Sequence, residues 1–327
     1  MRRKQLLTGG FASIGIIMFV LEGKTALAGA QAGIDLCIRC VIPSLFPILF
    51  LSILLSGSLY GSRVPFFHSL GKLLHMPKGS EIILITGFLG GYPAGAQAIA
   101  SVYESNQLDK KTAERLLSFC NNAGPAFLFG MVSPLFLNLF DSVSLWMIHI
   151  LSALYTALLI PSCNTDNIIS VPKHAYTIDS AMGKAIRVMA TVCGWIILFR
   201  GILEFLNRWL FWMFPITVQV ILCSFLELSN GICMMQEITD PGLRYVICSI
   251  MLAWGGLCVT LQTLSVIGSL SIKAYLKGKF LQTIISLILS ISVCMKIWFP
   301  VIILLLLPVI LLRKMKNSCS NPAIVGV

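Results

Sequence analysis

Charged residues are scarce in this chain: Asp, Glu, Lys and Arg make up 11% of its 327 residues. An ordinary soluble domain holds roughly 25%, and a soluble chain of this length needs far more charge to cover its surface. The scarcity excludes a soluble enzyme, a disordered chain and a nucleic-acid-binding domain. A disulfide scaffold is excluded as well, because the 11 cysteines lie mainly inside apolar stretches, where a free thiol behaves as a small apolar side chain.

Motifs of catalysis and nucleotide binding are also missing. The sequence has no Gly-x-x-x-x-Gly-Lys-Ser/Thr loop for ATP phosphates and no His-Glu-x-x-His for a catalytic zinc. Its one Cys-x-x-Cys, Cys37 and Cys40, lacks a second pair or a neighbouring histidine, so metal or redox use is the weaker interpretation. We therefore expect no catalytic residues, no metal and no cofactor, and the enzyme class is the weakest of the functional classes.

Apolar residues, in contrast, make up 57% of the chain, and the mean hydropathy is +0.89. A membrane-spanning helix needs about 20 apolar residues. The candidate spans are residues 6–21, 41–60, 82–100, 118–137, 143–160, 184–206, 209–226, 244–268 and 281–312, the last interrupted by Lys296 and Pro300. We predict an all-α polytopic membrane protein with about 8–10 transmembrane segments, some of them broken or re-entrant.

The formal net charge of +11 reflects basic residues at the ends of apolar runs. This distribution follows the positive-inside rule. It predicts that the loop 269–280, with Lys273, Lys277 and Lys279, is cytoplasmic and that the loop with Glu227, Glu237 and Asp240 is outside. Lys110 and Lys111 fall outside against the rule. The basic C-terminal residues return inside if residues 281–312 cross twice with a turn near Lys296, which we favour over one long crossing.

The chain divides into two halves of similar hydropathy pattern. We expect an N-terminal transmembrane anchor or cleaved signal segment (1–25), a first half (26–160), a polar linker (161–181), a second half (182–313) and a C-terminal tail (314–327). The amphipathic stretch 26–40 could enter the membrane part-way. Aligning Ser118 with Ser249 places Gly124 on Gly255. Such an internal duplication is common in secondary transporters.

Three interruptions fall within apolar segments: Gly90-Gly91-Tyr92-Pro93, Asn121-Asn122-Ala123-Gly124-Pro125 and Gly255-Gly256. Proline and glycine break helices, and backbone groups freed in a membrane need partners in protein or in a wet cavity. The competing interpretation is helix packing, because Gly87, Gly91 and Gly95 form a ladder of small residues. The predicted solute-binding residues are Gly90, Gly91, Tyr92, Pro93, Asn121, Asn122, Gly124, Pro125, Gly255, Gly256 and Gln262.

Ionisable residues near apolar runs are further candidates. Arg200 and Glu204 are four residues apart and are expected to pair with each other. Arg115 is expected to be solvated, on an amphipathic face. His149 is alone within a span and is expected to be a packed or interfacial residue.

Residues 86–96 (TGFLGGYPAGA) and 114–125 (ERLLSFCNNAGP) resemble the YlbJ family of sporulation integral membrane proteins, part of the group with nucleoside-recognition ("gate") domains. Residues 43–47 (PSLFP) and 227–231 (ELSNG) are similar to that family too. The resemblance implies two gate-like halves and a polytopic protein of the outer forespore membrane in a sporulating cell. It also implies a role in moving dipicolinate toward the spore.

We therefore expect a membrane transporter or permease for a small anionic metabolite, with dipicolinate favoured. The expected partners are that anionic solute and the lipid bilayer, with no nucleic acid, and a homo-oligomer is left open. Carboxylates would suit the N-terminus of a helix that begins at Pro125. The alternatives are a nucleoside-type solute transporter and a sporulation assembly factor that transports nothing.

Overall fold

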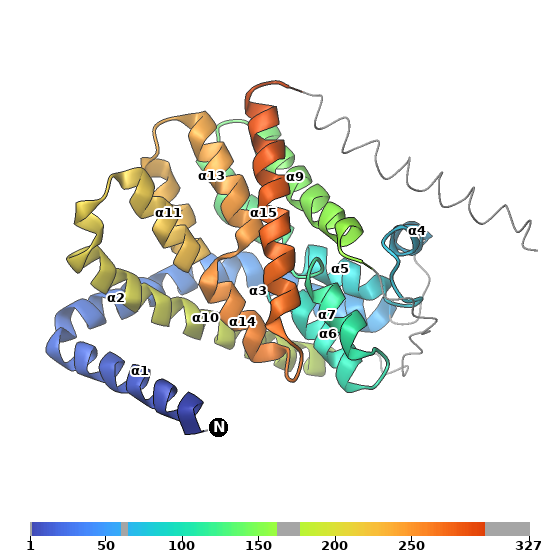
Figure 1. The fold of residues 1–327 in the computed structure, drawn as a ribbon, viewed down its shortest axis with the longest axis horizontal. Helices are drawn as coiled ribbons and strands as arrows, with labels where there is room; N and C mark the ends of the chain where they lie inside the picture. The colour runs from blue at the N-terminus through green and yellow to red at the C-terminus, as the bar shows by residue number, and fades with distance from the viewer. Residues whose placement is uncertain (1, 60–64, 162–176, 298–327) are drawn as a thin grey trace, which may run out of the picture.

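A computed structural model describes residues 2–59, 65–161 and 177–297 of the chain, and these residues form helices with no strand (Figure 1). The helices are α1 (Arg2–Leu21), α2 (Gly23–Leu36), α3 (Ile42–Leu59), α4 (Pro65–Leu73), α5 (Glu81–Leu89), α6 (Ala94–Glu104), α7 (Lys110–Leu117), α8 (Pro125–Phe127), α9 (Leu139–Leu159), α10 (Ile178–Trp209), α11 (Ile216–Leu226), α12 (Leu228–Met234), α13 (Pro241–Trp254), α14 (Gly256–Val266) and α15 (Ile272–Cys294).

The predicted class, an all-α polytopic membrane protein, is confirmed. Within the described residues, five helical stretches are long and apolar enough to cross a membrane: Gly23–Leu55, Leu139–Leu159, Ile178–Trp209, Pro241–Val266 and Ile272–Cys294. Five is fewer than the 8–10 segments expected. The difference arises because breaks divide candidates such as 82–100 and 118–137 into shorter helices, and because residues 298–312 lie outside the described part of the chain.

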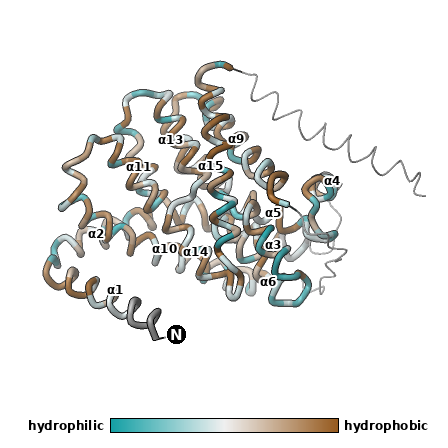
Figure 2. Tube along the Cα trace, viewed as in Figure 1, coloured by the Kyte–Doolittle hydropathy of each residue, from teal (hydrophilic) through white to brown (hydrophobic). Residues whose placement is uncertain are grey.

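The long helices form two groups. Helices α9, α13 and α15 pack alongside one another, while α2, α3 and α10 run across them in Figure 1. Helix α2 approaches α10 closely at Gly29, where a Cβ would lie only 2.8 Å from the Cα of Gly201. Apolar residues dominate the long helices in Figure 2, and large apolar side chains such as Ile284 and Ile288 are exposed on α15. Exposed apolar faces of this kind suit contact with lipid.

The N-terminal region is more continuous than expected. A π-helical turn, Cys37–Val41, joins α2 to α3, so the amphipathic stretch 26–40 and the candidate span 41–60 form one long helix. The expected boundary between residues 25 and 26 therefore lies inside α2. Helix α1 returns beside the C-terminal end of α10, where Glu22 and Arg208 form an ion pair of 3.3 Å.

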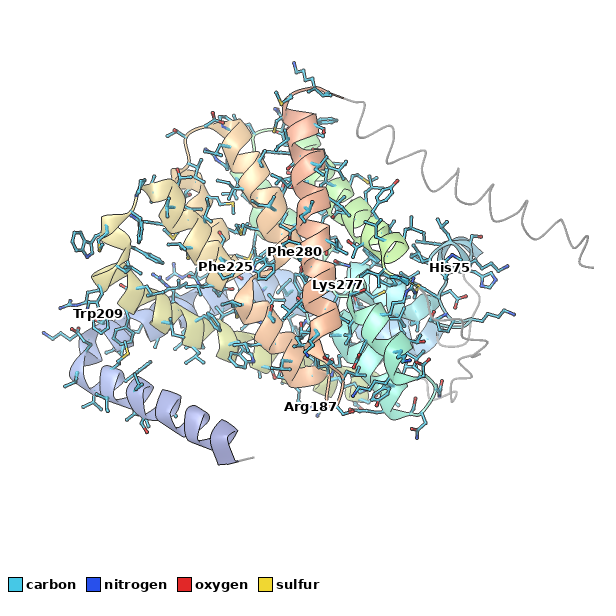
Figure 3. All side chains as sticks on the ribbon, in the orientation of Figure 1. His75, Arg187, Trp209, Phe225, Lys277 and Phe280 are labelled. Carbon is cyan, nitrogen blue, oxygen red and sulfur yellow. The ribbon has the colours of Figure 1, made fainter. Side chains whose placement is uncertain are left out.

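The expected loop 269–280 is wrong, because α15 begins at Ile272 and carries all three lysines. Lys277 and Phe280 are exposed (Figure 3), whereas Lys279 is buried. Helix α15 ends at Cys294, and Lys296 has a positive φ of 56°, so the helix stops where the turn was expected. The second crossing, Pro300, the tail 314–327 and most of the linker 161–181 lie outside the described residues.

The order of elements recurs along the chain. A long helix (α2–α3), a broken pair (α5–α6), a second broken segment (α7–α8) and a long helix (α9) are followed by α10, α11–α12, α13–α14 and α15 in the same order. Asp109 caps the N-terminus of α7 and Asp240 caps that of α13, at the same separation as Gly124 and Gly255. The division into two duplicated halves stays a prediction that this order favours.

Candidate solute site at the helix breaks

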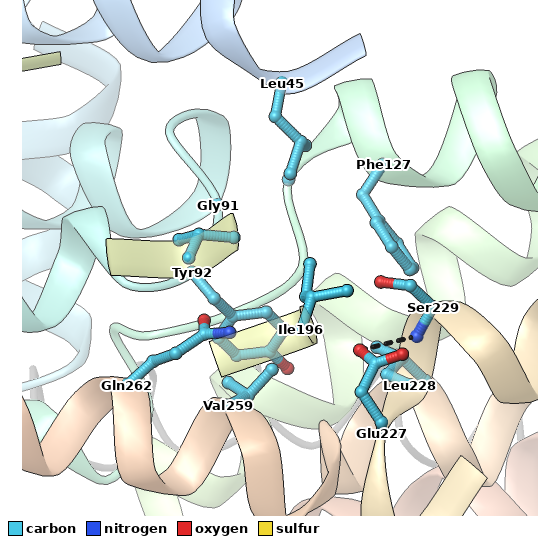
Figure 4. A pocket seen from close by; sticks show the side chains of 12 residues that line it. Leu45, Gly91, Tyr92, Phe127, Ile196, Glu227, Leu228, Ser229, Val259 and Gln262 are labelled. Carbon is cyan, nitrogen blue, oxygen red and sulfur yellow. Dashed lines mark hydrogen bonds between the residues drawn. The ribbon is translucent and has the colours of Figure 1, made fainter. Parts of the chain in front are cut away.

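Four helix breaks lie together: the three predicted interruptions and a fourth at Glu227, between α11 and α12. Three of these breaks line one small cavity, whereas Gly255-Gly256 lies beside it, next to Tyr92 and Leu228. The cavity holds about 30 Å³, roughly the volume of one water molecule in the liquid and about a tenth of a small ligand pocket. Its lining, shown in Figure 4, comprises Leu45, Gly91, Tyr92, Gly124, Phe127, Val192, Ile196, Glu227, Leu228, Ser229, Val259 and Gln262. The cavity is therefore too small for a metabolite, which enters only if the cavity widens.

The first two breaks are packed backbone against backbone. A Cβ at Gly124 would lie 2.9 Å from the amide nitrogen of Gly91, and Gly91 itself has a φ of +74°. A Cβ at Gly87 or Gly95 would overlap the carbonyl oxygen of Cys120. The packing interpretation therefore describes Gly87 and Gly95, whereas Gly91 and Gly124 line the cavity.

The two asparagines of the second break differ in their surroundings, although both are fully buried. The Asn121 Nδ2 donates to Thr263 Oγ1 (2.9 Å), and its Oδ1 accepts from the Ala96 amide (3.3 Å). Asn121 thus joins α6 to α14 and is absent from the cavity lining. The Asn122 Nδ2 donates to the carbonyl oxygen of Phe119 (2.6 Å), which leaves its Oδ1 for a different partner.

That partner is Lys279, whose side chain is 1% exposed. The Nζ donates to Asn122 Oδ1 (3.1 Å), Gln282 Oε1 (2.9 Å) and Tyr92 Oη (3.3 Å). None of the ion pairs found among the described residues includes Lys279. The fold therefore places the Lys279 ammonium, hydrogen-bonded to three neutral oxygens, next to the first and second predicted breaks.

His149 and Gln282 complete this polar cluster. Gln282 Nε2 donates to Asn122 Oδ1 (3.1 Å) and to the carbonyl oxygen of His149 (3.3 Å). The Ala123 amide donates to His149 Nε2 (3.1 Å), which places the ring proton on Nδ1, a buried atom with no hydrogen-bond partner. His149 is thus a packed residue, as expected, and it also fixes the backbone of the second break.

Glu227 shapes the opposite wall of the cavity. Its carboxylate caps α12 by accepting from the amides of Ser229 (3.0 Å) and Asn230 (2.7 Å), and from Asn230 Nδ2 (2.7 Å). Asn230 also lines a second, larger cavity of about 310 Å³, together with Arg200 and Glu237. The Glu227–Asn230 pair therefore separates the two cavities.

The remaining predicted residues lie near Tyr92, line the cavity or stand at helix ends. Gly255 and Gly256 have φ values of +82° and +86°, and a Cβ at Gly255 would lie 3.1 Å from Tyr92 Oη. That hydroxyl donates to the Leu252 carbonyl oxygen at 3.1 Å. Gln262 lines the cavity and donates to Cys258 Sγ (3.3 Å). The other members only delimit helices: Gly90 follows α5, Pro93 precedes α6, and Pro125 begins α8.

One expectation about charge near the site changes. Arg115 is buried rather than solvated and donates to backbone carbonyl oxygens, including those of Leu74 (2.8 Å) and Ala157 (3.1 Å). Helix α8 continues through a π-helical turn (Leu128–Val132) and a 3₁₀ turn (Ser133–Leu135), so the helix expected to begin at Pro125 runs from Pro125 to Leu135. The expected pair Arg200–Glu204 is confirmed at 3.1 Å.

Comparison with known proteins gives one informative relative. The chain is 30% identical over 133 residues to the sporulation integral membrane protein YlbJ of Bacillus subtilis (strain 168). The similarity supports the assignment to the YlbJ family. The match covers 39% of this chain and about a third (32%) of YlbJ. No family model matches the chain, and no solved structure matches it significantly. The YlbJ-like motifs at 86–96 and 114–125 are the segments that form the first two breaks.

Proposed function

We propose that this protein is a secondary transporter or permease for a small anionic metabolite, with dipicolinate as the favoured substrate. It would act in the outer forespore membrane of a sporulating cell and move its solute without changing it chemically. The observation that carries the proposal is the meeting of helix breaks at one small cavity whose lining includes the polar side chains of Tyr92, Glu227 and Gln262. Broken helices meeting within the membrane are a common way for transporters to build a solute site.

The similarity to YlbJ, whose name describes a sporulation integral membrane protein, supports the sporulation role. The five long apolar stretches support the placement in a bilayer. Backbone breaks in apolar surroundings need polar partners, and one such partner is the Tyr92 hydroxyl, which donates to the Leu252 carbonyl oxygen and which a solute could replace.

A second candidate is an assembly factor whose glycines only pack helices, which the contact of Gly87 and Gly95 with Cys120 favours. A nucleoside-type transporter is a third candidate, and an uptake assay with nucleosides tests it. The transport proposal predicts that spores lacking the protein hold less dipicolinate than wild-type spores and that externally supplied dipicolinate restores the content. Normal dipicolinate in the deletion strain would contradict it.

Uptake by the purified protein in liposomes gives the direct test. We expect accumulation of dipicolinate above protein-free liposomes, and none of the neutral nucleosides adenosine and uridine. Uptake of nucleosides alone would favour the nucleoside-type alternative. Uptake of neither solute, by protein that is folded and inserted, would favour the assembly factor.

A further inference from the structure

We propose that the Lys279 ammonium is the group that binds a carboxylate of the solute, and that the Tyr92 side chain covers this ammonium while the site is closed. The inference rests on the proposed function, because it assigns the anion-binding residue of the same site. Nothing in the sequence motifs of the breaks includes Lys279, which stands on α15.

Within the described part of the chain, no acidic side chain forms an ion pair with Lys279. Its three N–H donors meet three oxygens, so its hydrogen bonds are satisfied. Those oxygens belong to an amide from the second break, an amide from α15 and a phenol from the first break, and all three are neutral. A buried charge without an opposite partner is costly. A carboxylate that enters the site supplies the missing charge and forms a charge-assisted hydrogen bond.

Tyr92 lies between the cavity and this ammonium. Its side chain lines the cavity, and the Lys279 Nζ lies 5.1 Å from the centroid of its ring, in cation–π contact. The Tyr92 hydroxyl forms the longest of the three Nζ hydrogen bonds (3.3 Å), so it is the weakest partner to displace.

The alternative is that Lys279 only ties the breaks together. The two roles predict opposite effects of Lys279→Met, which keeps a similar volume without charge. Removing a buried charge that is only a cost leaves stability unchanged or raises it, whereas removing a structural tie lowers it. The Asn122 Oδ1 retains the Gln282 Nε2 in the variant.

The experiment measures the thermal unfolding of the purified protein in detergent, with and without saturating solute. The solutes are dipicolinate, benzoate and the uncharged pyridine-2,6-dicarboxamide. The matched control is Lys277→Met on the exposed face of the same helix. We expect dipicolinate to stabilise the wild type and Lys277→Met, and the dicarboxamide to stabilise neither. Lys279→Met should melt no lower than the wild type without solute and should bind dipicolinate about tenfold to a hundredfold more weakly.

Equal stabilisation of Lys279→Met and the wild type by dipicolinate would overturn the role of Lys279 and leave the transport proposal standing. Stabilisation of wild type by benzoate alone, lost in Lys279→Met, would support Lys279 and overturn dipicolinate as substrate. If no carboxylate stabilises the wild type, both proposals fail. A lower melting temperature for Lys279→Met without solute, with Lys277→Met unchanged, would favour the structural tie and overturn the inference.

Tyr92→Phe gives a second test that keeps the ring and the packing. It removes the hydroxyl that competes with the solute for Nζ, so we expect dipicolinate to bind severalfold more tightly than to the wild type. Weaker binding by this variant would show that the hydroxyl holds the solute and would overturn its role as a cover.

Discussion

Asn121 and Asn122 are adjacent in sequence, yet their side-chain amides bind different partners. Asn121 joins α6 to α14 through Ala96 and Thr263, whereas Asn122 holds Lys279. We expect Asn121→Leu to lower stability by about 0.6–2 kcal/mol, the value of an interhelical hydrogen bond in a membrane, and to leave dipicolinate affinity unchanged. Asn122→Leu should weaken dipicolinate binding as well. Thermal unfolding and a solute titration on each variant separate the two. Equal loss of affinity in both variants would contradict this division.

Asp109, which lies outside the membrane-spanning helices, contributes to the stability of the protein in a pH-dependent way. Burial works to raise its pKa, but hydrogen bonds from Thr112 and nearby backbone amides outweigh this and hold the pKa below its ordinary 3.8. The carboxylate caps α7 by accepting from the Thr112 amide at 3.0 Å. Asp109→Ala should cost about 0.5–2 kcal/mol at neutral pH. The native pKa is the lower one, so the charge-dependent part is present above pH 3.8 and is lost as pH falls through the native pKa. Unfolding of both proteins from pH 6 to pH 3 checks this, and a difference that grows in acid would contradict it.

Lys279 shows where reading residues one at a time fails. In sequence it joins Lys273 and Lys277 in what resembles a cytoplasmic basic loop. Helical spacing separates them, because Tyr275, Lys279, Gln282 and Ser286 recur every three or four residues and are all buried. A test for a polar stripe with helical period would have found Lys279 and Gln282. Glu227 carried a signal too, since it stands in the YlbJ-like ELSNG motif.

At the scale of elements, glycine contacts explain which small residues matter. Gly95→Ala in α6 places a Cβ against the Cys120 carbonyl oxygen, so we expect it to lower stability by about 1–3 kcal/mol. The control is Gly194→Ala in α10, where a Cβ meets no atom within 4 Å; it should be neutral or stabilising by up to about 1 kcal/mol. Thermal unfolding of both variants measures the contrast. Tolerance of alanine at Gly95 would show that α6 can move away from the second break.

The helix breaks were predictable and the continuity of the first long helix was not. Proline and glycine dictate local backbone, so Gly90–Pro93 and Asn121–Pro125 specify interruptions whatever surrounds them. Pro47 favours an interruption for the same reason. In the structure Arg39 is exposed on the π-helical turn and Pro47 lies within α3. Here packing against α10 outweighs the local preference.

At the scale of the whole molecule, α15 is long enough to connect the two sides of the membrane. Its end contacts the start of α13, where Cys294 Sγ lies 3.8 Å from the Gly242 carbonyl oxygen. We therefore expect a cysteine at Lys277 to be labelled from the cytoplasm and one at Glu237 from the opposite side. Both positions are exposed.

The measurement needs a background in which serine replaces Cys233 and Cys294, the thiols exposed among the described residues, and Cys163 and Cys319, which lie outside those residues. Restoring Cys294 alone gives an internal control, because it should label from the same side as Glu237. Labelling of Lys277 and Glu237 positions from one side would overturn the topology.

The polar stripe of α15 also bears on how the protein is made. A lysine at the centre of a helix adds about 2.5–3.5 kcal/mol to the cost of entering the bilayer from the translocon. Helix α15 carries Lys279 in its third turn, where part of this cost applies, and Gln282 one turn further on. Its partners for these groups stand on segments synthesised earlier, including α9. We expect α15 alone, fused behind a reporter span, to insert poorly, and its Lys279→Leu version to insert well. Glycosylation-site mapping would measure both. The helix that carries the proposed anion-binding lysine would then be synthesised late, and contacts with the helices already inserted would stabilise it in the membrane.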